Sequence, residues 1–322
     1  MNQTDYAYGV SYIRSIENRL MDKGDIEGLI LTKTPEEAMR MLNDKGYSNE
    51  PHPSSEFEQL LSKQQSLCWE TVREVAPNGA PLDILLYKND FHNLKVVIKA
   101  VFSANENFEN LFLTPATVDT AIIVEAISEK AFSKLPEMLR SVAERSYEAL
   151  SNTEDSQLSD IIIDKASMDY TMKCALESKS DFLIELIRLE NTLADIKIAY
   201  RAMKTEKNAD FLNQALSENS GLSRETLISV ALAGEDALLS FISQNGFEDA
   251  ANTLKISVSE FEKYQDSTKN AFVQRANFVT LGPEPLIAYI LKKQAELLSV
   301  RIIMSGKING FPESVIRERL RD

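Results

Sequence analysis

A short pattern recurs three times along this chain, at intervals of about one hundred residues. In each copy a small polar residue precedes an apolar residue, a basic residue and a further apolar pair; the copies are 93–100, 195–202 and 299–306. Their basic residues, Lys95, Lys197 and Arg301, lie 102 and 104 positions apart. Because recurrence at a near-constant period is the signature of repeat architectures, the pattern predicts three similar units.

A second marker follows each copy of the first. It consists of an apolar residue, a helix-start signal and another apolar residue five positions after the first; its copies are 113–118, 222–227 and 311–316. A unit of this length can bury its own core. We therefore predict one domain built from three repeats, roughly 1–112, 113–221 and 222–322, arranged with pseudo-three-fold symmetry as a ring, cone or stack.

The units are predicted to be helical. Gly and Pro together occupy 21 of 322 positions, about half of an average share, which argues against turn-rich β folds. Apolar residues recur at three- and four-residue steps, as at Tyr6, Val10 and Ile13, and no long alternation of period two is present. The fold class is therefore predicted to be all-α. We expect one helix to start at Thr34-Pro35 and another to run from Leu82 to about Ser103.

The charge of the chain bears on its partners. With 35 basic and 49 acidic side chains the net charge is −14, which disfavours nucleic acid and anionic lipid surfaces. Residues 266–322 differ, because they carry 9 basic and 6 acidic side chains, including Arg317 and Arg319. This basic segment is either a docking patch for an acidic partner or a source of neutralisation inside the molecule, where its charges also suit a helix C-terminus.

Few residues offer chemistry of their own. Cys68 and Cys174 are too far apart for a metal quartet and are predicted to be reduced packing residues. His52 and His92 have no second ligand at metal-binding spacing, and no glycine-rich phosphate loop or serine elbow occurs. We expect no cofactor, no metal and no catalytic residues. No run reaches the roughly 18 apolar residues of a membrane span, so we expect a cytoplasmic protein.

The three repeated basic residues have two interpretations. A basic residue among Val, Ile and Leu must reach water or find a carboxylate. Carboxylates occur along the same helices; they are Asp90 for Lys95, Glu190 or Asp195 for Lys197, and Glu296 for Arg301. The basic residues therefore either join helices inside each unit or line a shared axis and contact a partner.

Several stretches resemble a known family. The C-terminal stretches are 281–296, 300–303, 306–312 and 316–320, and they are joined by Tyr8, Arg14, Glu17 and Leu20 near the start and by Asp90 with 93–95 in the middle. Together they resemble the C subunit of V-type and archaeal A-type rotary ATPases, whose eukaryotic counterpart is the d subunit. The similarity touches both ends and the middle of the chain.

The resemblance implies a function and a set of partners. Members of this family are helical funnels of three similar units that sit on the cytoplasmic face of the membrane proteolipid ring. They receive the foot of the central shaft, formed by the D and F subunits, and turn with the rotor, which links ATP synthesis or hydrolysis to proton or sodium transport. They hydrolyse nothing themselves. The candidate shaft or ring contacts in this chain are Arg14, Lys95, Lys197, Arg301, Arg317 and Arg319.

Two other functions fit the same composition. A non-rotary helical-repeat scaffold would bind another protein assembly but neither the shaft nor the ring. An all-α enzyme would bury a carboxylate or lysine with a shifted pKa in a closed apolar pocket. The family resemblance favours the rotor protein over both.

Overall fold

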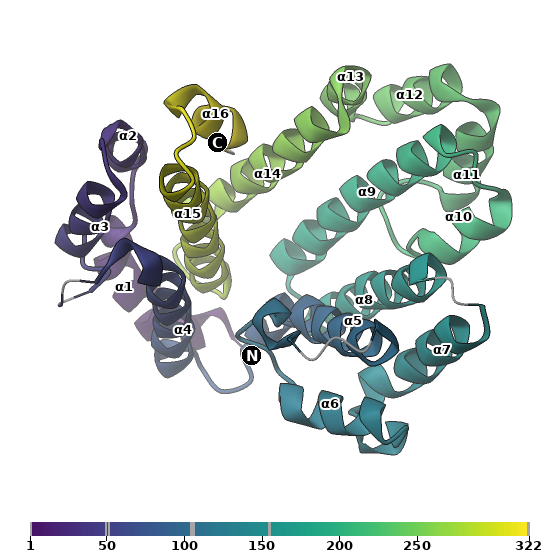
Figure 1. Cartoon of the computed structure of the whole chain (residues 1–322), viewed down its shortest axis with the longest axis horizontal. Coiled ribbons are helices and arrows are strands. Elements are labelled where there is room, and N and C mark those ends of the chain that lie inside the picture. The colour runs from purple at the N-terminus through teal and green to yellow at the C-terminus, as the bar shows by residue number, and fades with distance from the viewer. Residues whose placement is uncertain (1, 49, 51, 104–106, 154–155, 321–322) are drawn as a thin grey trace. The chain divides into compact units, whose positions relative to one another are not determined.

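The computed structural model describes residues 2–48, 50, 52–103, 107–153 and 156–320, and the secondary structure of these residues is helical, with no strand among them (Figure 1). The all-α prediction is confirmed. The chain divides into two compact units: unit 1 contains residues 1–80 and 266–322, and unit 2 contains residues 81–265.

Unit 1 is built from the two ends of the chain. Its α-helices are α1 (Ala7–Ile16), α2 (Lys23–Leu31), α3 (Pro35–Asp44), α4 (Phe57–Val75), α15 (Glu284–Ile308) and α16 (Glu313–Arg319). Short 3-10 helices accompany them: η1 (Gln3–Tyr6), η2 (Glu17–Arg19), η3 (Ser54–Glu56) and η7 (Arg275–Phe278). The long helix α15 packs against α1, α2, α3, α4 and α16, so it is the central element of this unit.

The core of unit 1 joins residues that are far apart in sequence. Leu29 and Leu42 from the N-terminal part meet Val300, Ile303 and Met304 of α15 in one buried cluster. These side chains are at most 2% exposed, so neither end of the chain buries its apolar face without the other.

The predicted start of α3 is confirmed in detail. The Thr34 hydroxyl accepts the Glu37 N–H at 3.1 Å, and Pro35 occupies the first helical turn, where its missing N–H leaves no bond unmade. The Glu37 carboxylate accepts the N–H of Lys33 at 2.7 Å instead of closing a capping box on Thr34. The helix ends before Gly46, whose φ of +84° favours glycine.

Unit 2 is a single stretch of chain. Its α-helices are α5 (Tyr87–Ser103), α6 (Thr120–Ser128), α7 (Glu137–Thr153), α8 (Ser156–Ser178), α9 (Asp181–Lys204), α10 (Ala209–Ala215), α11 (Arg224–Ala233), α12 (Glu235–Gln244), α13 (Glu248–Ile256) and the first part of α14 (Val258–Gln274). Its 3-10 helices are η4 (Pro81–Leu85), η5 (Glu109–Leu111) and η6 (Phe132–Lys134). The long helices α8 and α9 pack against each other (Figure 1).

Among the described residues of unit 2, two buried clusters surround helices that carry the repeated marker. One surrounds the first repeated helix, α5, and includes Leu94, Val97 and Ile127. The other surrounds α9 and includes Ile196 and Phe261. Each long helix that carries the repeated marker, α5, α9 or α15, therefore contributes to a buried cluster of its own.

The predicted continuous helix over residues 82–103 is wrong at its start. Residues Pro81–Leu85 form the 3-10 helix η4, and α5 begins only at Tyr87. The Leu86 N–H bonds to the Asp83 carbonyl, three residues back, at 2.8 Å. Leu82, Leu85 and Leu86 are all at most 5% exposed, so the 3-10 turn keeps all three side chains in the core.

Candidate functional site

The repeated basic residues bind carboxylates on other helices. In unit 2, Lys95 of α5 binds Asp164 of α8, and Lys197 of α9 lies 3.5 Å from Glu262 of α14. In unit 1, Arg301 of α15 donates its Nε–H to both oxygens of Glu58 on α4, at 3.0 and 3.1 Å. In each case the pair joins the marker helix to another long helix of the same unit.

Three of the four carboxylates that the sequence placed within reach of these basic residues have other roles. Asp90, Asp195 and Glu296 are buried, and the structure gives none of them a bond to the basic residue of its own repeat. Each accepts backbone N–H groups from a loop instead. Sequence proximity was misleading here, because the partner of each basic residue comes from a distant helix.

Asp90 holds the loop that precedes α6. Its carboxylate accepts the N–H groups of Thr117 and Val118, at 2.8 and 2.9 Å, and the Thr117 hydroxyl at 2.6 Å. Asn93 lies one turn further along α5; its amide oxygen accepts the Leu113 N–H, and its amide nitrogen donates to the Leu113 carbonyl. Burial raises the pKa of Asp90, although the three hydrogen bonds act in the opposite direction.

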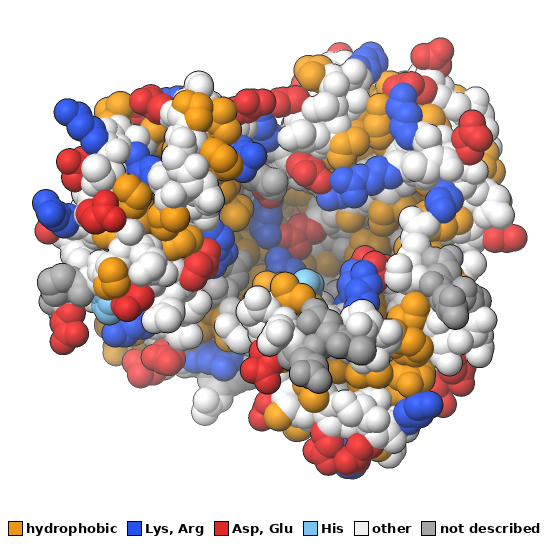
Figure 2. Space-filling model, in the orientation of Figure 1, with side chains coloured by type: hydrophobic (Ala, Val, Ile, Leu, Met, Phe, Trp, Pro, Cys, Tyr) orange, Lys and Arg blue, Asp and Glu red, His pale blue; other side chains and the backbone are white. Residues whose placement is uncertain are grey.

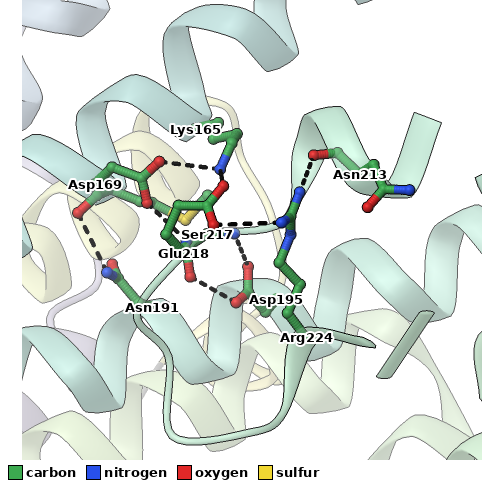
Figure 3. A network of polar contacts seen from close by, with 9 residues as sticks. Lys165, Asp169, Asn191, Asp195, Asn213, Ser217, Glu218 and Arg224 are labelled. Atoms are coloured by element: carbon green, nitrogen blue, oxygen red, sulfur yellow. Dashed lines mark hydrogen bonds and ion pairs between the residues drawn. The ribbon is translucent and has the colours of Figure 1, made fainter. Parts of the chain in front are cut away.

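Asp195 holds the corresponding loop before α11 (Figure 3). Its carboxylate accepts the Ser217 N–H at 3.0 Å and the Ser217 hydroxyl at 2.7 Å, while the Thr192 hydroxyl accepts the Gly221 N–H at 2.7 Å. Asp195 is 1% exposed, and this burial raises its pKa from 3.8 to about 6, with a smaller contribution from Asp169.

A second layer of charges surrounds this loop (Figure 3). Lys165 of α8 binds both Asp169, at 3.1 Å, and Glu218, at 2.5 Å. Asp169 accepts the Glu218 N–H at 2.8 Å, and Arg224 binds the other Glu218 oxygen at 3.3 Å. Lys165 lowers the pKa of Glu218. The loop is thus tied to α8, α9 and α11 at once, which makes it a rigid joint.

Glu296 performs the same task in unit 1. One carboxylate oxygen accepts the Met21 N–H at 2.8 Å, and the other accepts the Tyr47 hydroxyl and the Lys293 ammonium, the latter at 2.6 Å. Lys293 and Glu296 are 8% and 7% exposed. Burial, with the nearby Glu296 charge, raises the pKa of Tyr47 far above its ordinary value.

The three loops end in the same way. Met21, Val118 and Leu222 each stand directly before the N-cap residue of a short helix; those N-caps are Asp22 of α2, Asp119 of α6 and Ser223 of α11. The residues that hold the loops at this end, Asp90, Thr192 and Glu296, each precede the first repeated marker by three positions. This three-residue spacing is visible in the sequence, and it could have identified the residues that bind the loops.

The candidate residue Arg14 is engaged inside unit 1. Its guanidinium binds both oxygens of Glu17, at 3.0 and 2.9 Å. The other amino group donates to the carbonyls of Ala276 and Val279 at 2.8 and 3.0 Å, and to that of Asn277 at 3.3 Å. Arg14 therefore ties α1 to the chain around η7.

The last two candidates differ although they are two residues apart on α16. Arg317 binds Glu27 of α2 and, at 2.7 Å, Glu313, and these carboxylates raise its pKa. The Arg319 guanidinium lies 5.0 Å from the centre of the Phe311 ring, and no carboxylate among the described residues binds it. Arg317 thus anchors α16, whereas Arg319 keeps its charge at the surface.

The histidines make local contacts. In the His52 ring Nδ1 lies 3.1 Å from Glu56 Oε2 and Nε2 lies 3.0 Å from Ser48 Oγ, and the Ser48 oxygen also accepts the Glu50 N–H. The His92 ring contacts the Leu111 carbonyl at 3.1 Å. In the described part of the chain, no three His, Cys, Asp or Glu side chains are grouped as a metal site would require. Among those residues no helix combines the length and the apolar character needed to cross a bilayer.

The surface carries both signs of charge. Acidic and basic side chains alternate with apolar ones over the visible face of each unit (Figure 2). The groups described above are ion pairs, loop clamps and helix anchors. The fold and these contacts define an all-α protein. Its polar residues hold helices and loops in place, and its surface is charged.

Comparison with known proteins identifies the family. The model of the ATP synthase (C/AC39) subunit family matches residues 10–319. The chain therefore belongs to the ATP synthase (C/AC39) subunit family.

Two relatives illustrate the similarity. The C subunit of the V-type sodium ATPase of Enterococcus hirae is 23% identical over 315 residues, which cover 96% of both chains. The C subunit of the A-type ATP synthase of Methanocaldococcus jannaschii is 25% identical over an alignment of 354 residues, which covers 98% of this chain and 86% of the relative. The match extends over nearly the whole chain, so the resemblance predicted from its ends and middle is confirmed.

Proposed function

We propose that this protein is the central-stalk rotor component of a V-type or A-type ATPase. In this role it joins the shaft, formed by the D and F subunits, to the membrane proteolipid ring and passes torque between them without hydrolysing ATP. It would sit at the cytoplasmic face of the membrane as a peripheral component and serve proton or sodium transport. The observation that carries the proposal is the family match over residues 10–319.

The polar ties support a mechanical role. A torque coupler must resist deformation, and each marker helix is joined to a second helix by an ion pair and to a loop by buried hydrogen bonds. Buried polar groups with satisfied hydrogen bonds favour a single arrangement of the backbone. Such ties make each unit stiff without a ligand.

The same ties support three similar repeats, and we propose that these form the pseudo-three-fold funnel that the sequence predicts. The loop bonds favour a register in which the repeats begin at α5, α9 and α15. The third repeat would then be completed by α2, α3 and α4 from the other end of the chain, which pack on α15. This register moves the boundaries proposed from the sequence, near 112/113 and 221/222, to the starts of these helices.

The candidate contacts remain part of the proposal. Five of the candidates have partners inside the protein: Lys95, Lys197, Arg301, Arg317 and Arg14. Any contact with the shaft or ring would therefore use the hydrogen-bond donors that these ion pairs leave free. An interface between bodies of different symmetry cannot match residue for residue. A polar, adaptable contact therefore fits it better than an apolar lock.

Reconstitution tests the proposal. The full chain is mixed with the purified D and F subunits of the shaft and with detergent-solubilised proteolipid ring, and the mixture is separated by size. We expect one complex that contains the chain, the shaft and the ring. A chain that elutes alone, or that binds unrelated assemblies equally well, would identify a scaffold and contradict the rotor assignment.

A further inference from the structure

A groove lies between the last turns of α15 and the short helix α16. Its volume is about 400 Å³, within the range of roughly 300–1,000 Å³ that is usual for binding pockets. Apolar groups from Ile302, Gly306, Phe311 and Ile316 line it. Gly306 is required here, because a Cβ at this position would lie 2.6 Å from Ile316 Cγ1 and would push α16 away.

The groove is open to solvent and basic at its rim. Arg301 and Arg319 are both lining residues. The side chain of Arg301 is 42% exposed, and Phe311 is 39% exposed. A closed pocket for a small ligand would cover these groups, whereas an open apolar floor with a charged rim suits the side chains of a protein segment.

Both arginines retain unused donors. Arg301 binds Glu58 through Nε, so among the described residues the two terminal amino groups of its guanidinium keep their hydrogen-bonding capacity. Arg319 stacks on Phe311 and has no carboxylate partner among those residues. The segment 266–322 that contains them carries 9 basic and 6 acidic side chains in a protein of net charge −14. Charge complementarity therefore selects an acidic occupant.

We propose that the groove between α15 and α16 binds an acidic amphipathic helix of a partner protein, with apolar side chains on Ile302 and Phe311 and carboxylates on Arg301 and Arg319. The inference rests on the proposed function, because it adds one contact point between this protein and a neighbour in the rotor. Arginine with carboxylate gives bidentate, directional bonds, so the contact fixes the rotational position of the bound helix.

A synthetic probe tests the groove directly. The probe is a labelled helical peptide of about 18 residues with leucines on one face and glutamates on the other, and its matched control has glutamine in place of every glutamate. Binding to the full chain is measured by fluorescence anisotropy. We expect the glutamate peptide to bind at least about tenfold more tightly than the glutamine peptide. The ratio of the two affinities should decrease as the NaCl concentration rises from about 0.05 M to about 0.5 M, because salt screens the charges.

Variants separate the groove from general attraction. Arg319→Gln breaks no ion pair with any residue that the structure describes, so it should fold normally and weaken binding of the glutamate peptide about tenfold. Arg301→Gln should act in the same way, and Ser305→Trp should block the floor while both arginines remain. The matched control is Arg145→Gln, an exposed arginine on α7, which should leave binding unchanged. Equal binding of the two peptides, or equal effects of Arg319→Gln and Arg145→Gln, would overturn the proposal.

Two further measurements separate this inference from the proposed function. If the Arg301→Gln/Arg319→Gln variant forms the shaft–ring complex as tightly as the unchanged chain, the groove proposal fails and the rotor assignment stands. If the unchanged chain forms no such complex but binds the glutamate peptide through both arginines, the rotor assignment fails and the groove retains an acidic partner. Arginine-dependent binding to vesicles of anionic phospholipid, without peptide binding, would show a lipid site and overturn the inference.

Discussion

At the scale of single residues, the buried carboxylates hold loops in place by accepting hydrogen bonds from backbone N–H groups. Asp195 shows this most clearly, because its pKa of about 6 lies above the ordinary 3.8. Between about pH 4 and pH 6 the native state retains a proton that the unfolded chain releases. The free energy of unfolding therefore falls as pH rises through this window, and the loss is complete above about pH 6.

Asp195→Asn should remove most of this dependence. The amide can still accept the Ser217 N–H and can donate to the Ser217 hydroxyl, so the loop keeps its ties. At pH 7 we expect a free energy of unfolding about 1 kcal/mol higher than that of the unchanged chain, with about 3 kcal/mol as the upper limit set by the pKa difference. Urea unfolding at several pH values measures this, with the exposed Asp210→Asn as control. An unchanged slope between pH 4 and pH 6 would contradict the assignment.

Glu296 should be more sensitive to truncation. Glu296→Ala leaves the Lys293 ammonium buried without its carboxylate and leaves the Met21 N–H without its acceptor. We expect a loss of about 3–5 kcal/mol in the free energy of unfolding, measured by denaturant titration. The double variant Lys293→Met/Glu296→Leu should recover part of it, since apolar residues replace both charges while the Met21 N–H and the Tyr47 hydroxyl still lack their acceptor. A loss under about 1 kcal/mol for the single variant would mean that water reaches this pair.

At the scale of elements, each marker helix is fastened by a pair that is only partly buried. Lys95 and Asp164 have side chains that are 20% and 54% exposed, so the pair contributes little to stability. Lys95→Glu should lower the free energy of unfolding by about 0.2–1 kcal/mol, and the exchanged pair Lys95→Glu/Asp164→Lys should restore it. Thermal unfolding in low salt measures both, with Lys63→Glu on α4 as an exposed control. Failure of the exchange to restore stability would show that Lys95 acts through another neighbour.

The sequence predicted elements better than contacts. The helix start at Thr34 and Pro35 and the all-α class followed from local rules, because caps and periodicity depend on neighbouring residues. The second repeated marker aligned Leu113 with Leu222, yet the helix N-caps place Val118 in the position of Leu222, because each of these two residues directly precedes an N-cap. The length of the loop differs between the repeats, and a local sequence pattern cannot detect that difference. The partners of Lys95, Lys197 and Arg301 were missed for the same reason, since tertiary packing selects them.

At the scale of the whole molecule, the order of the chain and the order of the units differ. Unit 2 is continuous, whereas unit 1 draws on residues 1–80 and 266–322. The buried cluster of unit 1 combines Leu29, Leu42 and Leu61 with Val300 and Ile303, so the N-terminal helices share their core with the C-terminal helix. The N-terminal helices therefore cannot bury their core until the C-terminal helix α15 is present.

Fragments of the chain test this dependence. A fragment of residues 81–274, which ends with α14, contains both buried clusters of unit 2 and should fold alone with cooperative thermal unfolding. Fragments 1–80 and 275–322 should each be poorly ordered in isolation and should form a helical complex when mixed, as followed by circular dichroism and co-purification. In that complex Arg14 regains the carbonyls of Ala276 and Val279, so Arg14→Gln should weaken the association, and Lys63→Glu serves as the control. Cooperative unfolding of fragment 1–80 by itself would show that the N-terminal helices hold their own core, and the composite unit would then be wrong.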